Sequence, residues 1–298
     1  MEIVVFGAGS LGSLLGGLLA REHEVTLVGR EPHVKAIRAN GLRITGEIET
    51  TVYPEASSEP PDSADLAVVC VKAFDTGAAA DALAGRELEA CLSVQNGLGN
   101  EAILEDRLEA TVLAGTCTYG ATRGKPGVVE CNGIGRVTLG PRSGGESKAA
   151  DRVGAAFEAA GIVTTVSSDM PERLWEKLAV NAGLNATTAL ARLENGAVLD
   201  GDAGSVAAEA AREAAAVARS DGVPLGGAAA EEALIRVAEA TAENTSSMHA
   251  DVLGERRTEV DAINGYVERR ADELGIDAPI NATMARLLRA FETGRGLR

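Results

Sequence analysis

Residues Gly7–Gly12 read GAGSLG, directly after the β-branched run EIVVF at 2–6 and before the apolar stretch SLLGGLLARE at 13–22. The six residues match G-x-G-x-x-G at a turn between a strand and a helix. In this pattern the first glycine permits the tight turn, the second lets a pyrophosphate approach the backbone, and the third lets helix and strand pack closely. The N-terminus of the helix then faces the phosphates. The residues expected to bind a dinucleotide here are Gly7, Gly9, Ser10, Leu11 and Gly12.

Apolar runs of strand length alternate with helix-like stretches through the first half of the chain. The runs lie at 2–7, 24–29, 65–71, 91–95, 111–117, 128–131 and 136–140, and the helix-like stretches at 74–84, 100–108 and 148–160. Such alternation predicts a parallel sheet covered by helices on both faces. After about residue 167 the alternation stops.

From residue 168 onward the pattern is helical almost to the end. The expected helices lie at 170–192, 203–220, 227–243, 258–274 and 279–292. The sequence therefore predicts two domains, a dinucleotide-binding α/β domain at 1–167 and an all-α domain at 168–298. The last residues, TGRGLR at 293–298, are expected to be frayed.

Charge and composition exclude several classes of function. Lys and Arg total 28 against 44 Asp and Glu, which gives a net charge of −16 and argues against nucleic-acid binding. No apolar run reaches the ~18 residues of a membrane span, and the start of the chain has no basic flank, so a cytoplasmic protein is expected. Four scattered cysteines without a C-x-x-C pair, and only three histidines, argue against a metal site and a disulfide framework. The expected assembly is a monomer or a homodimer, and the sequence does not distinguish them.

The acidic balance is combined with very few lysines. Only five lysines occur in the chain, aromatic residues make up 3%, and alanine and glycine are abundant. Because salt screens the repulsion between like charges, this composition favours an origin in a halophilic archaeon. An ordinary acidic protein encoded by a GC-rich genome is the alternative.

The end of the second expected strand indicates the type of dinucleotide. A fold that prefers NAD usually carries Asp or Glu there, on the ribose diol. Here the strand ends in Val28-Gly29-Arg30, and an arginine suits a 2′-phosphate, so NADPH is the expected cofactor. The alternative is that Arg30 only ends a strand. The adjacent Glu31 is expected to be turned away by Pro32.

A stripe of polar residues marks the first helix of the second domain. Lys177, Asn181 and Asn185 recur at a spacing of four, so they share one helix face, and their neighbours are small or apolar. Buried polar groups are costly unless they are paired, so such a stripe indicates a ligand site. A satisfied hydrogen-bond network between helices is the alternative.

A second polar cluster follows at residues 244–248, with Glu259 further along the chain. Glu259 is expected on a helix face shared with Ala262, Ile263 and Tyr266, where a carboxylate without a role would be unusual. An ion pair with Arg256 is the structural alternative.

These motifs together resemble the ketopantoate reductase (2-dehydropantoate 2-reductase) family. The matching stretches are GAGSLG at 7–12, VKAF at 71–74, QNG at 95–97, KLAVNAGLN at 177–185, ENTSSM at 243–248 and RRTEVDAINGY at 256–266. The resemblance implies a Rossmann N-terminal domain, an all-helical C-terminal domain and an active site in the cleft between them. It also implies NADPH-dependent reduction of ketopantoate to pantoate, a step toward pantothenate and coenzyme A.

The resemblance also assigns roles to individual residues. By their matching positions, Lys177 is the general acid, and Glu259 is the carboxylate that holds the substrate hydroxyl. Arg30 matches the residue on the adenosine 2′-phosphate. The substrate-binding positions are Asn181, Asn185, Asn244 and Ser247, and the positions near the cofactor and nicotinamide are Lys72 and Asn96. The chain departs from the family pattern at Gln95, where a histidine is expected, and at His249, where an apolar residue is expected.

The chemistry of the reaction favours the same residue. Reducing a 2-keto acid leaves an alkoxide, which needs a proton donor and a positive field. His249 is the one histidine placed to compete with Lys177 for that role, but an ammonium can both attract the carbonyl oxygen and donate a proton. Two alternatives stay open: a related NAD(P)-dependent reductase of another 2-keto or 3-hydroxy acid, and a non-catalytic sensor of a dinucleotide or of coenzyme A.

Overall fold

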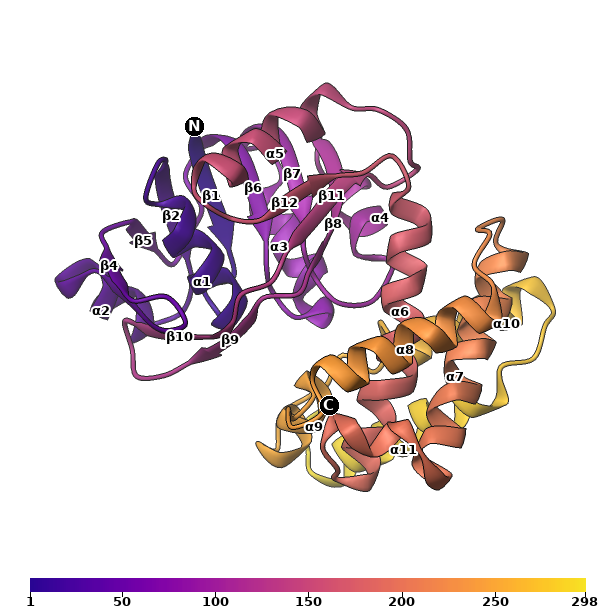
Figure 1. The fold of residues 1–298 in the computed structure, drawn as a ribbon. Helices are drawn as coiled ribbons and strands as arrows, with labels where there is room; N and C mark the ends of the chain where they lie inside the picture. Colours follow the sequence, from indigo (N-terminus) through magenta and orange to yellow (C-terminus); the bar gives the residue numbers. More distant parts are fainter. The chain divides into compact units, whose positions relative to one another are not determined.

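The computed structural model describes residues 1–298, which separate into two units. Met1–Gln95 and Asn100–Met170 form the α/β unit, and Pro171–Arg298 together with Asn96–Gly99 form the helical unit. The short segment Asn96–Gly99 thus belongs with the helical unit although both of its flanks belong to the α/β unit. Figure 1 shows the two kinds of architecture.

The α/β unit is built on an eight-stranded sheet in the order β12-β11-β8-β7-β6-β1-β2-β5. Its strands are β1 (Glu2–Phe6), β2 (Glu24–Val28), β5 (Glu55–Ser57), β6 (Ser63–Val69), β7 (Glu87–Ser93), β8 (Thr111–Cys117), β11 (Val137–Pro141) and β12 (Thr164–Val166). Neighbouring strands run parallel except for β8 and β11, which pair antiparallel. The parallel sheet expected from the sequence is therefore confirmed, with one antiparallel pair toward its edge.

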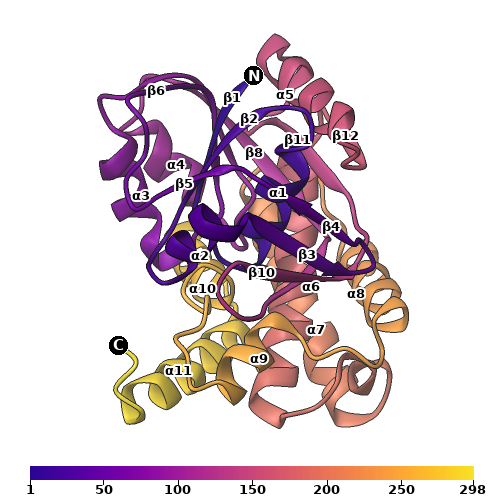
Figure 2. The same ribbon diagram turned by 90° about the vertical axis from the view of Figure 1, so that its left-hand side faces the viewer.

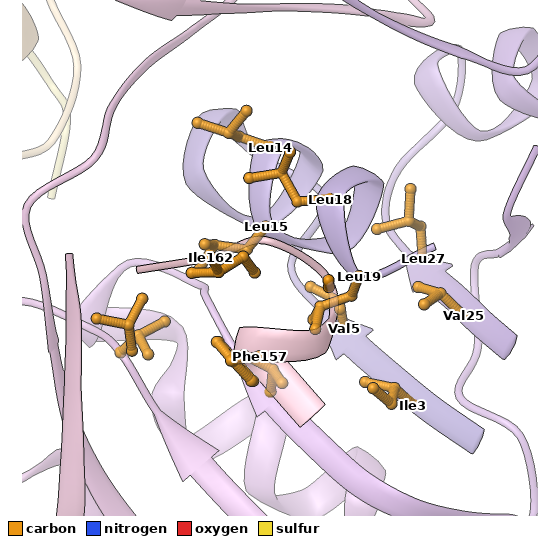
Figure 3. Packing of buried hydrophobic residues seen from close by; sticks show 14 of the residues in the cluster. Ile3, Val5, Leu14, Leu15, Leu18, Leu19, Val25, Leu27, Phe157 and Ile162 are labelled. Atoms are coloured by element: carbon orange, nitrogen blue, oxygen red, sulfur yellow. The ribbon is translucent and has the colours of Figure 1, made fainter. Parts of the chain in front are cut away.

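Helices cover both faces of this sheet. Successive side chains of a strand point to opposite faces, so neighbouring residues of β1 pack against different helices. Ile3 and Val5 of β1 pack in one apolar cluster with α1 (Ser10–Leu19) and α5 (Lys148–Ala159). Figure 3 shows that cluster, with Phe157 and four leucines of α1 gathered over the strands. Val4 between them packs in a second cluster with α3 (Thr76–Leu83) and α4 (Asn100–Glu105).

A second, four-stranded sheet lies on the far side of α1. Its order is β4-β3-β10-β9, with β3 (Leu42–Gly46), β4 (Thr50–Val52), β9 (Gly120–Arg123) and β10 (Val128–Gly133), and α2 (His33–Asn40) precedes it (Figure 2). The run expected at 128–131 is thus a strand of this sheet and not of the main one. Two glycines of α1 permit the close packing: a Cβ on Gly16 would lie 2.4 Å from Leu27, and one on Gly17 would lie 2.9 Å from Ile44.

The helical unit contains six α-helices and a 3₁₀ helix. They are α6 (Met170–Ala191), the 3₁₀ helix η2 (Asn195–Leu199), α7 (Gly201–Ser220), α8 (Gly227–Ala240), α9 (Ser247–Leu253), α10 (Asn264–Leu274) and α11 (Pro279–Gly294). The buried face of α7 is made almost entirely of alanines. Small residues bring α6 and α7 close together, since a Cβ on Gly183 would lie 2.4 Å from the Ala207 carbonyl oxygen.

Two expectations for the end of the chain are wrong. The helix expected at 258–274 begins only at Asn264, so Glu259 lies in a loop and not on a helix face. The last residues are not frayed, because Arg295 pairs with Glu255 and Arg298 pairs with Asp261 and Glu292.

Candidate active site

Three loops of the α/β unit meet at the carboxyl ends of β1, β2 and β6. The backbone N–H groups of Gly7 and Ala8 both donate to the Val28 carbonyl, at 3.0 and 2.8 Å. The Cys70 N–H donates to the Phe6 carbonyl at 2.8 Å. The chain extends from β1 to β2 on one side and returns to β6 on the other, and such a switch point is where open α/β sheets bind their ligands.

The glycine turn after β1 has the geometry that a dinucleotide requires. Gly7 has a φ of +106°, and a Cβ on Gly12 would lie 2.1 Å from the Gly7 carbonyl oxygen, so both positions demand glycine. A Cβ on Gly9 would meet no atom closer than 3.9 Å, which leaves the backbone open to a ligand. No side chain caps the N-terminus of α1, and the Ser10 hydroxyl accepts a bond from the Arg123 N–H at 3.0 Å. These residues fit a pyrophosphate at the helix N-terminus.

Arg30 stands directly beyond the turn that ends β2, as the sequence predicts. Its side chain is 89% exposed and lies 3.6 Å from the Asp75 carboxylate. Glu31 is turned to α2, where its carboxylate accepts the Lys35 N–H at 3.1 Å. Arg30 is therefore a solvent-facing cation at the edge of the sheet where an adenosine ribose would lie in this fold.

Lys72 follows β6 and begins the 3₁₀ helix η1 (Ala73–Asp75). The segment around it is held by Gln95, whose amide donates to the Val71 carbonyl at 3.0 Å and to the Thr76 hydroxyl at 2.7 Å. The buried glutamine thus anchors the chain on both sides of Lys72. This gives a structural reason for Gln95 at the position where the resemblance leads us to expect a histidine.

The polar stripe of the helical unit lies on α6. Lys177 and Asn181 are half-buried, and Asn185 is 5% exposed. The stripe is fixed from behind, because the Asn264 side chain of α10 donates to the Ala182 carbonyl of α6 and to Asn281 of α11, both at 3.0 Å. This buried hydrogen-bond network joins α6 to α10 and α11, and so fixes the backbone of α6 between Asn181 and Asn185.

Asn96 and Glu259 come together within the helical unit. The Asn96 amide donates to the Glu259 carboxylate at 3.1 Å. The backbone beside it is fitted closely, since Leu98 N–H donates to the Ala262 carbonyl at 3.1 Å. Gly97 has a φ of +81°, and its Cβ would lie 2.4 Å from the same oxygen. The Arg256 alternative is not what the structure shows, because Arg256 pairs with Asp251 at 3.1 Å.

Asn244 and Ser247 lie on either side of Ser246, which is hydrogen-bonded to α6. Ser246 begins α9: its hydroxyl accepts the His249 N–H at 3.2 Å and bonds to the Thr188 hydroxyl at 2.7 Å. Asn244 and Ser247 are exposed on either side of it. The His249 ring is buried without a hydrogen-bond partner for either nitrogen. The sequence pattern did not indicate that Ser246 and Thr188 join α9 to α6, because hydroxyl pairs leave no periodic signal.

An aromatic pair also belongs to this part of the helical unit. The Trp175 ring of α6 and the Tyr266 ring of α10 meet edge to face with centroids 5.8 Å apart. A Cβ on Gly99 would lie 3.4 Å from the Tyr266 ring, so the pair is next to the Asn96–Gly99 segment. The sequence pattern indicates Tyr266 only as an apolar neighbour of Glu259, because an edge-to-face ring pair between distant helices leaves no periodic signal.

Two further observations concern other kinds of site. No group of three or more His, Cys, Asp or Glu side chains is arranged to hold a metal ion. None of the helices has both the length and the apolar character needed to cross a membrane.

Comparison with known proteins shows the family to which the chain belongs. Residues 3–144 match the family model "Ketopantoate reductase PanE/ApbA", and residues 169–292 match "Ketopantoate reductase PanE/ApbA C terminal". A 2-dehydropantoate 2-reductase of Halobacterium salinarum is 43% identical over 299 residues, covering 97% of this chain and 98% of that protein.

Solved structures agree with this assignment. The ketopantoate reductase of Ralstonia eutropha superposes with a TM-score of 0.91 at 35% identity, covering 99% of this chain and all of that one. D-mandelate dehydrogenase in complex with NADH and anilino(oxo)acetate superposes with a TM-score of 0.93 over the whole of both chains, but at 24% identity that likeness shows the fold alone. By its sequence and its fold, the chain belongs to the ketopantoate reductase family.

Proposed function

We propose that this chain is an NADPH-dependent 2-dehydropantoate 2-reductase that converts ketopantoate to pantoate, a step toward pantothenate and coenzyme A. The observation that carries the proposal is the hydrogen bond between Asn96 and Glu259, which orients a buried carboxylate in the same helical unit as the polar stripe. A carboxylate in that position suits a keto acid that carries a hydroxyl group. Family membership supports the reaction class.

The α/β unit, proposed as a domain of residues 1–167, holds the cofactor. Gly7, Gly9, Ser10, Leu11 and Gly12 bind the pyrophosphate through the backbone and the start of α1. Arg30 binds the 2′-phosphate, with Lys72 close to the remainder of the dinucleotide. When it is bound, the dihydronicotinamide supplies the hydride that reduces the keto carbon.

The helical unit, proposed as a domain of residues 168–298, supplies the proton and orients the substrate. Lys177 attracts the keto oxygen and gives it a proton, because the reduced carbon would otherwise carry an alkoxide. The substrate-binding residues are Asn181, Asn185, Asn244 and Ser247, whose amides and hydroxyl can donate to the substrate's carboxylate and carbonyl oxygens. Glu259 accepts the bond from the substrate hydroxyl, and Asn96 orients that carboxylate.

The proposal further places the enzyme in the cytoplasm, as a monomer or a homodimer, with ketopantoate as its small-molecule partner. Loss of absorbance at 340 nm tests it, with NADPH and either ketopantoate or 3,3-dimethyl-2-oxobutanoate, which differs only by lacking the hydroxyl. We expect kcat/KM to be about 10- to 100-fold higher for ketopantoate, the size of one charge-assisted hydrogen bond. A preference for the analogue would indicate a reductase of another keto acid, and no oxidation with either substrate would indicate a sensor.

A further inference from the structure

The carboxylate proposed to hold the substrate hydroxyl lies in a loop without regular secondary structure. Residues 254–263 join α9 to α10 and contain no helix or strand. Nevertheless Glu259 is only 6% exposed, and its neighbours Thr258 and Val260 are 1% and 0% exposed. After Glu259 the chain forms turns, in which the Glu259 carbonyl accepts the Ala262 N–H at 3.0 Å and the Ile263 N–H at 3.1 Å. Immediately before Glu259 no such local bond is present, so that side of the loop depends on contacts with other elements.

On that side, one buried carboxylate makes the contact. Glu292 of α11 has no exposed surface, and its Oε1 accepts the Thr258 N–H at 2.7 Å and the Thr258 hydroxyl at 2.6 Å. The same hydroxyl accepts the Val260 N–H at 3.2 Å. Thr258 and Val260 are thereby fixed, directly and through one hydroxyl, to a single oxygen of Glu292, and Glu259 lies between them.

The other oxygen of Glu292 is held by the last residue of the chain. Arg298 donates to Glu292 Oε2 and also pairs with Asp261, two residues beyond Glu259. Arg289 of α11 donates to the other Asp261 oxygen at 2.8 Å. Burial alone would raise the pKa of the Asp261 carboxyl, but the hydrogen bonds and positive charges of Arg289 and Arg298 outweigh it and lower that pKa below its ordinary value. The loop is therefore fastened to α11 on both sides of Glu259.

Burying a carboxylate completely carries a large desolvation penalty. Removing its charge from water costs several kcal/mol unless hydrogen bonds satisfy it, and an apolar residue of similar size would avoid that cost. An apolar side chain could not accept the Thr258 N–H, however, and that N–H would then be buried without a partner. What the carboxylate contributes specifically is the geometry of the loop.

We infer that Glu292 is a positioning residue: through Thr258 it fixes the backbone on both sides of Glu259 and so orients that carboxylate toward the substrate hydroxyl. The inference rests on the proposed function for the role of Glu259. Glu292 is completely buried, so it acts through the loop and not by direct contact with substrate or cofactor. Its effect on the reaction is therefore selective, and it concerns the part of catalysis that depends on the hydroxyl.

Four variants test the inference. Thr258→Val keeps the shape of the side chain and removes its hydroxyl, whereas Thr258→Ser keeps the hydroxyl. Glu292→Gln keeps the size and removes the charge that Arg298 pairs with. Thr293→Val is the matched control, because the Thr293 hydroxyl is exposed on α11 and bonds only within its helix, to Arg289 O at 2.9 Å.

Two measurements apply to each variant. The first is the ratio of kcat/KM for ketopantoate to kcat/KM for 3,3-dimethyl-2-oxobutanoate, which does not depend on how much of the protein is active. The second is hydrogen exchange of the peptide that covers residues 254–263. We expect Thr258→Val and Glu292→Gln to lower the ratio about tenfold and to speed exchange in that peptide. Thr258→Ser and Thr293→Val should leave both close to wild type.

Different outcomes separate this inference from the proposed function. If Glu259→Ala lowers the ratio but Thr258→Val and Glu292→Gln do not, Glu292 does not position Glu259. Unchanged exchange at 254–263 in both variants overturns the inference whatever the activities are. If Glu259→Ala leaves the ratio unchanged, the proposed role of Glu259 is wrong, and exchange alone then decides whether Glu292 holds the loop.

Discussion

The side-chain amide of Asn96 donates a 3.1 Å hydrogen bond to the carboxylate of Glu259, 163 residues further along the chain. Asn96 belongs to a four-residue segment that packs with the helical unit although it follows a strand of the α/β unit. A carboxylate has about four lone-pair sites, so Glu259 can accept this bond and a substrate hydroxyl together. The bond from Asn96 therefore orients the Glu259 carboxylate and leaves lone pairs available for the substrate hydroxyl.

Glu259→Ala should lower activity only with a substrate that carries the hydroxyl group. We expect kcat/KM with ketopantoate to fall about 10- to 100-fold, because a charge-assisted hydrogen bond to the hydroxyl is lost. With 3,3-dimethyl-2-oxobutanoate the change should be small, since that substrate has no hydroxyl. Glu239→Ala, which removes an exposed carboxylate from α8, is the control. Equal losses on both substrates would show that Glu259 has only a structural role.

Arg30→Ala should weaken binding of NADPH and leave binding of NADH nearly unchanged. Arg30 is exposed and only loosely paired with Asp75, so removing it should disturb little else. The loss of a charge-assisted bond to the 2′-phosphate predicts a Kd for NADPH about tenfold or more higher. Fluorescence titration with both cofactors measures this, with the exposed Arg43→Ala in β3 as the control. An unchanged preference for NADPH would mean that another residue reads the phosphate.

Strong periodic patterns allowed much of the molecule to be predicted. The β1–turn–α1 unit is as expected because three spaced glycines follow an apolar strand, and the helix α6 is as expected because polar residues interrupt its apolar pattern at a spacing of four. The strands of the second sheet at 42–46 and 50–52 were missed. They are short and rich in polar residues, and their stability comes from pairing with β10 and packing on α1.

The loop around Glu259 could not be predicted for a different reason. Residues 258–263 have a helical pattern of apolar positions, which is why a helix was expected there. Residues 259–263 form turns and no continuous helix, and the start of the loop at Thr258 is held by Glu292, 34 residues away. Local periodicity contains no information about such a distant partner, so tertiary contacts override the helical preference. The Asn96–Glu259 bond was not foreseen either, because its residues match separate motifs.

His33 should make the folded protein less stable at mildly acid pH. Its Nδ1 accepts the Gly127 N–H at 3.0 Å, and its Nε2 bonds to the Ser13 hydroxyl at 3.0 Å. A protonated ring would place a proton on Nδ1 against that N–H. Burial, with the charge of Arg123, lowers the pKa of His33 from its ordinary 6.5.

The sign of this effect follows from the lowered pKa. Well above pH 6.5 the ring is neutral in both states and the stabilisation is fully present. As the pH falls below that value the unfolded chain binds the proton first, so the free energy of unfolding decreases. Urea unfolding between pH 5 and 7.5 measures the slope, which we expect to be smaller in His33→Gln. An identical slope in the variant would contradict the effect, and His23→Gln serves as the control for replacing a histidine.

Salt should stabilise this protein. The net charge of −16 creates repulsion between acidic groups, which is screened poorly in dilute buffer, where the Debye length is about 30 Å at 0.01 M. Salt also weakens the many exposed arginine ion pairs, but each of these contributes only about 0–1 kcal/mol. We therefore expect Tm and activity to be higher in 2 M KCl than in 0.05 M KCl. Equal Tm values at the two concentrations would contradict a halophilic adaptation.

The most direct test of the account is the kcat of Lys177→Ala in the 340 nm assay with NADPH and ketopantoate. General-acid catalysis contributes about 10²–10⁴-fold, so kcat should fall by that factor while the Kd for NADPH stays close to wild type. Lys177→Arg should not restore activity, because a guanidinium keeps its proton. Lys148→Ala, which removes an exposed lysine from α5, should match wild type. Wild type should also lose kcat at alkaline pH, where the ammonium is lost, and Lys177→Ala should lack this loss. If Lys177→Ala retains more than about a tenth of the wild-type kcat, Lys177 is not the proton donor.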